Sequence, residues 1–299
     1  MLSSATFDFP LWAGYACVPF ISRRITGPAM PELPEVETTR RGIEPHIIGK
    51  RIKRVDVRQP KLRWPVPEAI HQAEKHKLQA VERRGKYLLF RFSNGTILAH
   101  LGMSGSMRII QENEPPLFHD HVDLVCSDGV ALRYCDPRKF GAWLWTEDDP
   151  HQHPLLAKLG PEPLADQFNT HYLVEKAKGR KSAIKTFIMD SHIVVGVGNI
   201  YANEALFMAG IHPKRAAGRV SAARYERLVQ AIKTVLANAI EMGGTTLRDF
   251  VGGDGKPGYF QQTLRVYGRA DEPCLNCKQP LKEIRLGQRS TVFCKLCQT

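Results

Sequence analysis

The sequence lacks any apolar run long enough to cross a membrane, and it has no internal repeat and no low-complexity tract. It is also short of acidic residues: 30 Asp and Glu stand against 42 Lys and Arg, a formal net charge of +12. This basic excess favours a polyanionic partner such as nucleic acid or an acidic membrane surface, although charge alone leaves open a basic protein that binds neither. The 299 residues have the composition of a globular chain with room for two domains.

Cysteine is too sparse for a disulfide framework spread along the fold. There are seven cysteines, an odd number. Cys17, Cys126 and Cys135 are scattered, whereas the other four form one pattern near the C-terminus. A reducing compartment is the better interpretation of this distribution.

Residues 1–29 do not match a targeting signal. The basic pair Arg23 and Arg24 follows an apolar stretch instead of preceding it, which is the wrong order for a secretory signal. The segment is also poor in the Arg and Ser of an organellar transit peptide. We therefore expect Met30 to be the true initiator and residues 1–29 to be an extension outside the active protein.

The remaining chain divides into a strand-rich part and a helical part. Residues 31–159 contain short apolar or alternating runs separated by hairpin-type turns, which predict a sandwich or barrel-like domain with one clear helix. The runs are 86–92, 96–100 and 122–125, the turns are 93–95 and 127–129, and the helix is 35–41. Residues 160–164 are typical of a linker. In residues 165–260, an apolar stripe from Tyr225 to Ile240 follows the candidate N-cap Ser221 and predicts a core helix.

The strongest local signal is a pair of cysteine knuckles within residues 265–299. Cys274 and Cys277 are separated from Cys294 and Cys297 by a hairpin-length loop, a spacing that suits a closed, structural four-thiolate zinc site. Two disulfides are the alternative. Arg289 lies at the expected hairpin tip, where an arginine is either solvated or in contact with a phosphate.

A glycine-rich turn and a proline motif are two further candidate sites. Gly196 and Gly198 lead into a helix expected to start near Asn199, where free N–H groups would attract phosphate; a turn selected for packing is about as plausible. Removal of Met30 would expose a secondary amine at Pro31 beside Glu32, a possible nucleophile and general acid. From the residues alone, the better explanation of this second motif is the ordinary preference for proline and acidic residues at the start of a helix.

Six motifs, taken together, resemble the formamidopyrimidine-DNA glycosylases. They occur in the order of that family and span nearly everything from Met30 to Thr299. They are Met30–Glu37, His100–Gly105, Asp136–Gly141, Gly196–Tyr201, Asp254–Tyr259 and the four-cysteine pattern.

The resemblance implies an enzyme that excises oxidised purines such as 8-oxoguanine and formamidopyrimidines, and then cleaves the strand as a lyase. Pro31 would attack C1′ and form an iminium, and Glu32 would protonate the opening sugar, supported by Glu35. Lys86 and Arg289 complete the implied catalytic set. The implied DNA-binding residues fill the gap left by the flipped base, contact phosphates or lie near the reacting sugar. They are His100, Met103, Arg138, Phe140, Lys185 and Asn199.

The implied fold is α+β: an N-terminal β-sandwich with flanking helices, then a helical domain with a helix–two-turn–helix element and a zinc-finger β-hairpin. One structural Zn²⁺ is expected, held by the four cysteines. The expected partner is double-stranded DNA with oxidised purines or abasic sites, and we expect no membrane association. We expect a monomer in the bacterial cytoplasm, associated with the nucleoid through DNA. The glycine-rich segment 245–259 resembles a lid over the lesion.

Two other functions remain open at this stage. A sibling glycosylase for oxidised pyrimidines has the same layout and nucleophile, although Leu33, the Met103/Arg138/Phe140 set and the lid favour the purine enzyme. A non-catalytic zinc-containing lesion-binding protein is the alternative if residues 1–29 are retained, because Pro31 would then be an amide nitrogen without a lone pair to donate.

Overall fold

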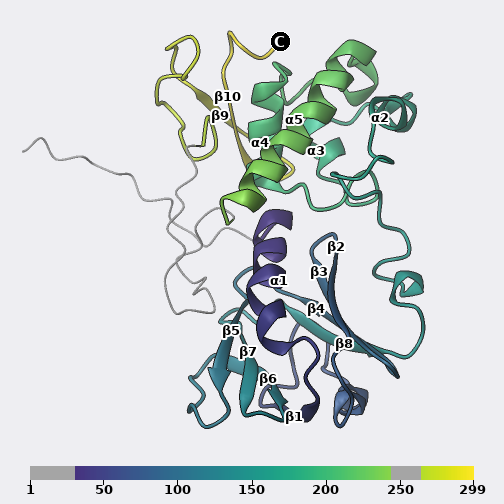
Figure 1. Cartoon of the computed structure of the whole chain (residues 1–299). Coiled ribbons are helices and arrows are strands. Elements are labelled where there is room, and N and C mark those ends of the chain that lie inside the picture. Colours follow the sequence, from purple (N-terminus) through teal and green to yellow (C-terminus); the bar gives the residue numbers. More distant parts are fainter. Residues whose placement is uncertain (1–30, 244–263) are drawn as a thin grey trace, which may run out of the picture.

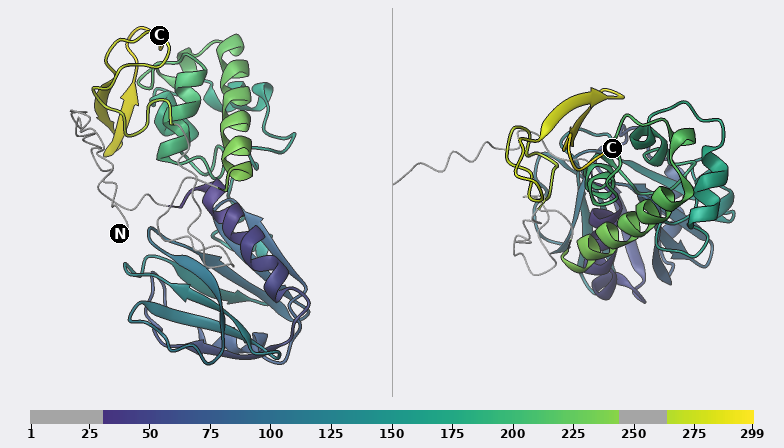
Figure 2. Two further views of the ribbon diagram at one scale, coloured as in Figure 1. Left: turned by 60° about the vertical axis from the view of Figure 1, so that its left-hand side comes forward. Right: turned by 90° about the horizontal axis from the view of Figure 1, so that it is seen from above.

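The computed structural model describes residues 31–243 and 264–299, so Met30 and the expected lid at 245–259 lie outside the described residues. Two bodies follow one another along the chain (Figure 1). The left-hand view of Figure 2 shows the later helices (teal and green) and the C-terminal hairpin at one end, and the sheets with the first helix (purple) at the other. Within these described ranges, no helix is long and apolar enough to cross a membrane.

The first body is a sandwich of two four-stranded antiparallel sheets, with α1 (Leu33–Ile47) packed beside it. One sheet has the order β1-β6-β7-β5 and the other has the order β2-β3-β4-β8. The strands are β1 (Ile52–Val57), β2 (Ala80–Arg84), β3 (Tyr87–Phe92), β4 (Gly95–His100), β5 (Ser106–Gln111), β6 (Asp120–Cys126), β7 (Val130–Cys135) and β8 (Ala142–Thr146). Short 3₁₀ turns lie at η1 (Glu68–Ala73) and η2 (Pro150–Gln152).

The turns that join these strands follow from local sequence. Ser93 and Asn94 make the two-residue loop between β3 and β4, with Phe92 paired to Gly95. Gly129 has a φ of +86°, the left-handed conformation that the β6–β7 turn needs and glycine adopts without strain. Phe90 stacks on Trp143 between the sheets, and apolar side chains from both sheets and from α1 form one core. The strands and turns predicted from sequence are confirmed, and the predicted helix at 35–41 is longer than expected.

The second body is helical and ends in a small hairpin. Its helices are α2 (Thr170–Ala177), α3 (Ile184–Ile188), α4 (Asn199–Met208) and α5 (Ala222–Glu241), with a 3₁₀ turn η3 (Ala217–Arg219) before α5. The predicted stripe faces the core as expected, and α5 starts after Ser221. The hairpin consists of β9 (Lys282–Leu286) and β10 (Arg289–Phe293). Gly287 and Gln288 both have positive φ, which is the two-residue turn that suits a twisted hairpin.

The predicted α+β fold is thus confirmed. Residues 160–164 lie between the two bodies in the chain, and Glu162 is hydrogen-bonded to β2 and to the turn between β2 and β3. Glu162 Oε1 accepts hydrogen bonds from the Gly85 N–H (2.7 Å) and Arg84 Nη1 (2.9 Å), and Oε2 accepts one from Arg83 Nη1 (2.7 Å). The turn that precedes Lys86 is therefore held against the linker.

Candidate active site

Glu32 lies where the two bodies meet, and its carboxylate occupies the N-terminus of α4. Oε2 accepts a hydrogen bond from the Gly198 N–H and Oε1 from the Ile200 N–H, each at 2.9 Å, and the Tyr201 N–H lies 3.4 Å from Oε2. The first N–H groups of a helix have no partner within it, so a carboxylate is well placed there. The side chain is only 3% exposed. The N–H groups that the sequence offers at this helix start are thus hydrogen-bonded to the Glu32 carboxyl group.

The glycines of the preceding turn make this approach possible. A Cβ on Gly198 would lie 2.2 Å from Glu32 Cδ, and one on Gly196 would lie 2.4 Å from Leu33 Cδ1. Gly196 also has a φ of +80°, and its carbonyl accepts the Leu33 N–H at 3.2 Å. The turn therefore serves packing, one of the two roles that the sequence left open, and the packing places a functional carboxyl group.

Glu35 joins the same network one helical turn later. Its Oε2 accepts the Glu32 N–H at 2.9 Å and its Oε1 accepts the Tyr201 hydroxyl at 2.7 Å. Glu35 thus fixes the backbone at Glu32 and ties α1 to α4. Because Pro31 immediately precedes this fixed residue and is itself buried, the start of the described chain is positioned by the same contacts.

Burial is the main influence on the protonation of Glu32. It raises the pKa of this carboxyl to about 7, against the opposing effect of the Lys86 ammonium and together with the nearby Glu35. Burial also lowers the pKa of Lys86, an effect that Glu32 and Glu35 oppose. A carboxyl group that titrates near neutral pH can hold a proton and give it up, as a general acid requires.

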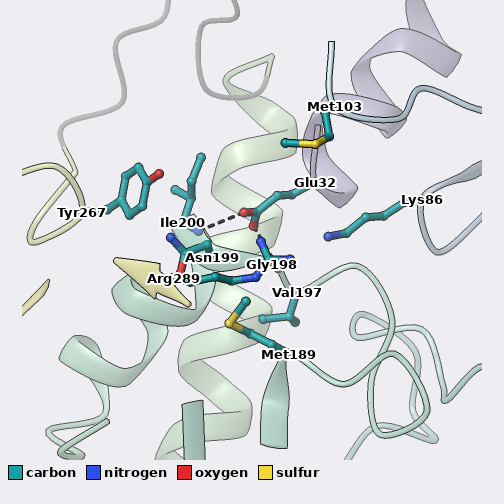
Figure 3. A pocket seen from close by; sticks show the side chains of 10 residues that line it. All are labelled: Glu32, Lys86, Met103, Met189, Val197, Gly198, Asn199, Ile200, Tyr267 and Arg289. Atoms are coloured by element: carbon teal, nitrogen blue, oxygen red, sulfur yellow. Dashed lines mark hydrogen bonds between the residues drawn. The ribbon is translucent and has the colours of Figure 1, made fainter. Parts of the chain in front are cut away.

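These groups line a cavity of about 190 Å³ between the two bodies. Figure 3 shows Glu32 at its centre, with Lys86 and Arg289 approaching from opposite sides. Lys86 comes from the β2–β3 turn and Arg289 from the zinc-finger hairpin. The lining residues are Glu32, Lys86, Met103, Met189, Val197, Gly198, Asn199, Ile200, Tyr267 and Arg289. Five of the residues singled out from sequence thus meet in one cavity, beside Pro31 and Glu35.

His100 lies close to this cavity without lining it. Its Nδ1 accepts the Gly102 N–H at 2.9 Å, which leaves Nε2 as the protonated nitrogen of a neutral ring. Burial lowers the pKa of His100 to about 4, with Lys86 and Arg63 acting in the same direction. His100 is therefore a neutral hydrogen-bond donor at physiological pH.

Arg138 and Phe140 lie on the loop between β7 and β8, at the end of the sandwich. The Arg138 guanidinium is 5.2 Å from the centre of the Phe140 ring, and 46% of Phe140 is exposed. A large ring presented to solvent is not explained by core packing. Met103, on the neighbouring loop, is partly exposed and reaches the cavity.

Lys185 lies beneath the cavity and is completely buried. Its Nζ donates to Asn199 Oδ1 (2.7 Å), the Ser290 carbonyl (2.8 Å) and Thr291 Oγ1 (2.7 Å). Lys185 therefore connects α3, the start of α4 and the zinc-finger hairpin, and it determines which way the Asn199 amide points. Its place beneath the cavity could not be predicted from sequence.

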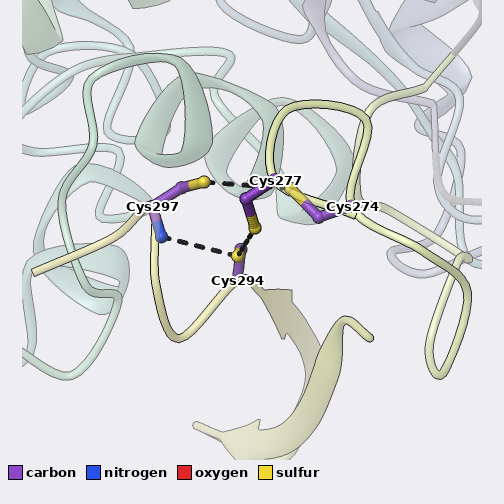
Figure 4. A group of neighbouring side chains, drawn as sticks. All are labelled: Cys274, Cys277, Cys294 and Cys297. Atoms are coloured by element: carbon purple, nitrogen blue, oxygen red, sulfur yellow. Dashed lines mark hydrogen bonds between the residues drawn. The ribbon is translucent and has the colours of Figure 1, made fainter. Parts of the chain in front are cut away.

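The four predicted zinc ligands converge (Figure 4). All four Sγ atoms lie within 4.8 Å of one another, and the four cysteines are free, so the disulfide alternative is not formed. Zn–S bonds of about 2.3 Å in a tetrahedron place sulfurs roughly 3.8 Å apart. The Cys274–Cys297 and Cys277–Cys294 Sγ distances are 3.9 and 3.4 Å, which fits such an ion.

Comparison with known proteins agrees with this geometry in each part of the chain. Residues 30–143 match the family model of the formamidopyrimidine-DNA glycosylase N-terminal domain, and residues 159–251 match that of the H2TH domain of the same enzymes. Residues 271–299 match the zinc finger found in FPG and IleRS. The chain belongs to the formamidopyrimidine-DNA glycosylase family.

Individual relatives agree closely over their whole length. The chain is 62% identical to the formamidopyrimidine-DNA glycosylase of Marinomonas sp. (strain MWYL1) over 272 residues, which are 90% of this chain and 100% of that protein. The corresponding protein of Saccharophagus degradans is 60% identical over 270 residues, with the same coverage.

Solved structures of the family superimpose on the chain. The Fpg protein from Thermus thermophilus has a TM-score of 0.80 at 38% identity, covering 90% of this chain and 98% of its own. Lactococcus lactis Fpg in complex with DNA containing an N7-benzyl-Fapy-dG has a TM-score of 0.82 at 34% identity, covering 90% and 99%. The same enzyme bound to DNA with an abasic site also has a TM-score of 0.82, at 33% identity, covering 89% and 99%.

Family membership and the converging thiolates together establish one structural zinc ion, held by Cys274, Cys277, Cys294 and Cys297. The finger buries only a small apolar cluster, which includes Val266 and Leu281 and is completed by Phe207 from α4. The ion supplies the folding free energy that such a cluster cannot.

Several contributors to the site were missed from sequence. Tyr201 ends the motif around the glycine-rich turn and Glu204 follows it by three residues, but nothing indicated what they bind. Glu204 accepts hydrogen bonds from three backbone N–H groups at the start of the finger, those of Arg265, Val266 and Tyr267, at 2.8 to 2.9 Å. Met189 and Tyr267 line the cavity without any sequence signal.

Proposed function

We propose that Pro31, once it is the first residue of the chain, is the nucleophile of a bifunctional DNA glycosylase and AP lyase of base excision repair. The enzyme removes oxidised purines, 8-oxoguanine and formamidopyrimidines, from duplex DNA. The observation that carries this proposal is the position of Glu32. Its carboxyl group is buried, titrates near pH 7 and lies in a cavity between two basic side chains, directly beside Pro31.

The covalent chemistry follows from a secondary amine beside a proton donor. The Pro31 nitrogen lone pair attacks C1′ while the bond from C1′ to the base breaks. The base leaves with the bonding electrons and takes up the proton that the Pro31 amine loses. Glu32 gives its proton to the sugar ring oxygen as the ring opens, leaving a cationic iminium. Loss of a C2′ proton sends its electrons into the iminium, and β-elimination then breaks the C3′–O bond. Loss of the C4′ proton next allows δ-elimination to break the C5′–O bond, and each phosphate leaves with the bonding electrons. Glu35 holds the Glu32 backbone throughout.

Phosphate binding and base flipping use the remaining side chains. Lys86 and Arg289 supply positive charge at the cavity, while neutral His100 and the Asn199 amide donate hydrogen bonds, so binding is only partly ionic. Met103, Arg138 and Phe140 fill the gap after the damaged nucleotide leaves the stack. Lys185 positions Asn199 from below.

The domain division accompanies this proposal. Residues 31–159 form the catalytic β-rich domain, 160–164 the linker, 165–260 the helical domain with the lid, and 265–299 the zinc finger. Residues 1–29 are an extension, outside the match that begins at residue 30. A monomer in the bacterial cytoplasm, bound to nucleoid DNA, is the proposed working form.

Borohydride trapping tests this function. Protein begun at Met30 is incubated with a duplex carrying 8-oxoguanine opposite cytosine, and reduction should give a covalent adduct on the peptide that starts at Pro31. A duplex with an oxidised pyrimidine serves as the comparison, because the sibling enzyme would prefer it. If no adduct forms on either duplex, the enzyme proposal is wrong and a lesion-binding protein remains.

The pKa of Glu32 predicts how base excision depends on pH. The carboxyl group supplies its proton only when protonated, and burial raises its pKa to about 7. The contribution of Glu32 to the rate is therefore expected to decline as the pH rises through about 7, and to fall roughly tenfold per pH unit well above 7. Single-turnover base release between about pH 5.5 and 8.5 measures this. Glu32→Gln should abolish base release but retain trapping on an abasic site, where the base is already gone. A Glu32→Gln profile with the same high-pH decline would contradict the assignment.

A further inference from the structure

Two large apolar side chains are exposed on a loop that the chemistry does not use. Phe118 is 91% exposed and Leu117 is 70% exposed, in the connection between β5 and β6. Single exposed apolar residues are ordinary, but an adjacent exposed pair is less common.

This loop is fixed in place by hydrogen bonds. The Leu117 N–H donates to Asp120 Oδ2 at 2.8 Å, and the Asp120 N–H donates back to the Leu117 carbonyl at 3.0 Å. Buried Arg133 donates to the carbonyls of Pro115 and Glu114 at 3.1 and 3.0 Å. The backbone around the exposed Phe118 is therefore fixed by hydrogen bonds. A surface that is already ordered before a partner binds loses less conformational entropy on binding.

The sheet register places this loop next to the loops that carry Met103, Arg138 and Phe140, called the wedge residues below. Cys135, at the end of β7, pairs with Ser106 of β5 on one side and with Asp120 of β6 on the other. Three loops therefore share this end of the sheet. The loop with Met103 enters β5, the loop with Arg138 and Phe140 leaves β7, and the loop with Phe118 enters β6. The Asp136 N–H donates to the His119 carbonyl at 3.0 Å and joins the last two.

Strand spacing then gives the distance along the DNA. Neighbouring strands are about 4.8 Å apart, so the β5 and β6 loops lie roughly 10 Å apart, with the β7 loop between them. Base pairs are stacked at about 3.4 Å, so a duplex whose axis followed this edge would advance about three base pairs between Met103 and Phe118.

We propose that Phe118, assisted by Leu117, is a further DNA contact that packs against the sugar edges of the minor groove about three base pairs from the lesion. The inference rests on the proposed function, because it takes Met103 as the marker of the lesion and Phe140 as an apolar wedge, the kind of side chain that enters from the minor groove. The contact is apolar, so it adds affinity without adding a phosphate contact.

A flank-length series with the full chain tests the contact. Duplexes with a stable abasic-site analogue are shortened one pair at a time on either side, and affinity is measured by fluorescence anisotropy. For the wild type, shortening one flank from about five pairs to two should weaken binding about tenfold, since a buried ring contributes on that scale. Phe118→Ala should bind the long duplex about tenfold more weakly, and its affinity should not drop further when that flank is shortened. The dependence of its affinity on salt concentration should be unchanged. Phe118→Leu should retain part of the dependence on flank length.

Leu296→Ala is the matched control, because Leu296 is 65% exposed on the zinc finger and belongs to no proposed contact. The proposal is overturned if Phe118→Ala matches the wild type on the long duplex, if its loss is the same at every flank length, or if sedimentation shows that Phe118 joins two copies of the chain. Borohydride trapping distinguishes failure of the proposed function from failure of this contact. If the wild type forms no adduct, the proposed function is wrong. If the wild type forms an adduct but its affinity does not depend on flank length, only the proposed contact is wrong.

Discussion

Protein that retains residues 1–29 is expected to form no borohydride-trapped adduct, whereas protein begun at Met30 and processed to Pro31 is trapped efficiently. With the extension attached, the Pro31 nitrogen belongs to a tertiary amide, and its lone pair is delocalised and cannot attack C1′. The expected difference is a fall in adduct to below about 1% of the short form, because the nucleophile is lost and not merely weakened. Gel analysis after reduction and intact-mass measurement of each preparation provide the test.

Lesion binding gives the control for this comparison. Both forms should bind a stable abasic-site analogue, because the cavity and the wedge lie in residues 31–299. An adduct on protein whose measured mass includes the extension would contradict the assignment of Pro31. Sequencing of the adduct peptide would then identify the lysine that reacts in its place.

Removal of zinc is expected to have the second largest effect, and one that extends beyond the finger. Without the ion the hairpin cannot hold its fold, so Arg289 leaves the cavity. Lys185 loses two of its three acceptors, Ser290 and Thr291, and Glu204 loses its three backbone donors. Loss of charge-assisted contacts of about 2 to 3 kcal/mol corresponds to roughly 100-fold weaker DNA binding.

Chelation of the ion, and separately Cys277→Ala, test this expectation through zinc content, affinity and limited proteolysis. Cleavage should be confined at first to residues 264–299 while the sandwich stays resistant, because its core shares no residue with the finger. Cys126→Ala is the matched control, since Cys126 is buried in the first domain and far in sequence from the metal ligands. Unchanged affinity in zinc-free protein would show that the finger does not position Arg289.

The features that could be predicted from sequence are those set by residue spacing and backbone preference within a short segment. The stripe on α5 and the turns at Asn94 and Gly129 follow from spacing and backbone preference, and the cysteine knuckles follow from ligand geometry. The motif order gave the family, and with it the residues that meet in the cavity.

Features that depend on long-range packing could not be predicted. Nothing local distinguishes Lys185, completely buried beneath Asn199, from a lysine that contacts phosphate. Likewise, no pattern indicated that the anion at the start of α4 would be Glu32, which lies 166 residues before Gly198. Tyr267 lines the cavity, and its backbone N–H is bound by the distant Glu204. Such contacts are set by tertiary structure, which a periodicity analysis does not contain.

The contact between Glu32 and the start of α4 also bears on how the two halves can be recombined. Residue 32 belongs to the sandwich, but the burial that raises its pKa comes in part from residues 196–201 of the helical half. A sandwich expressed alone would carry an ordinary, fully ionised carboxylate at neutral pH. In a chimera with the helical half of a relative, the pKa of Glu32 would be raised only if the relative's glycine turn packed against Leu33 and Glu32 as closely as this one does. The surroundings of the Glu32 carboxyl group are thus formed by both halves, and a change in either half at this contact would alter them.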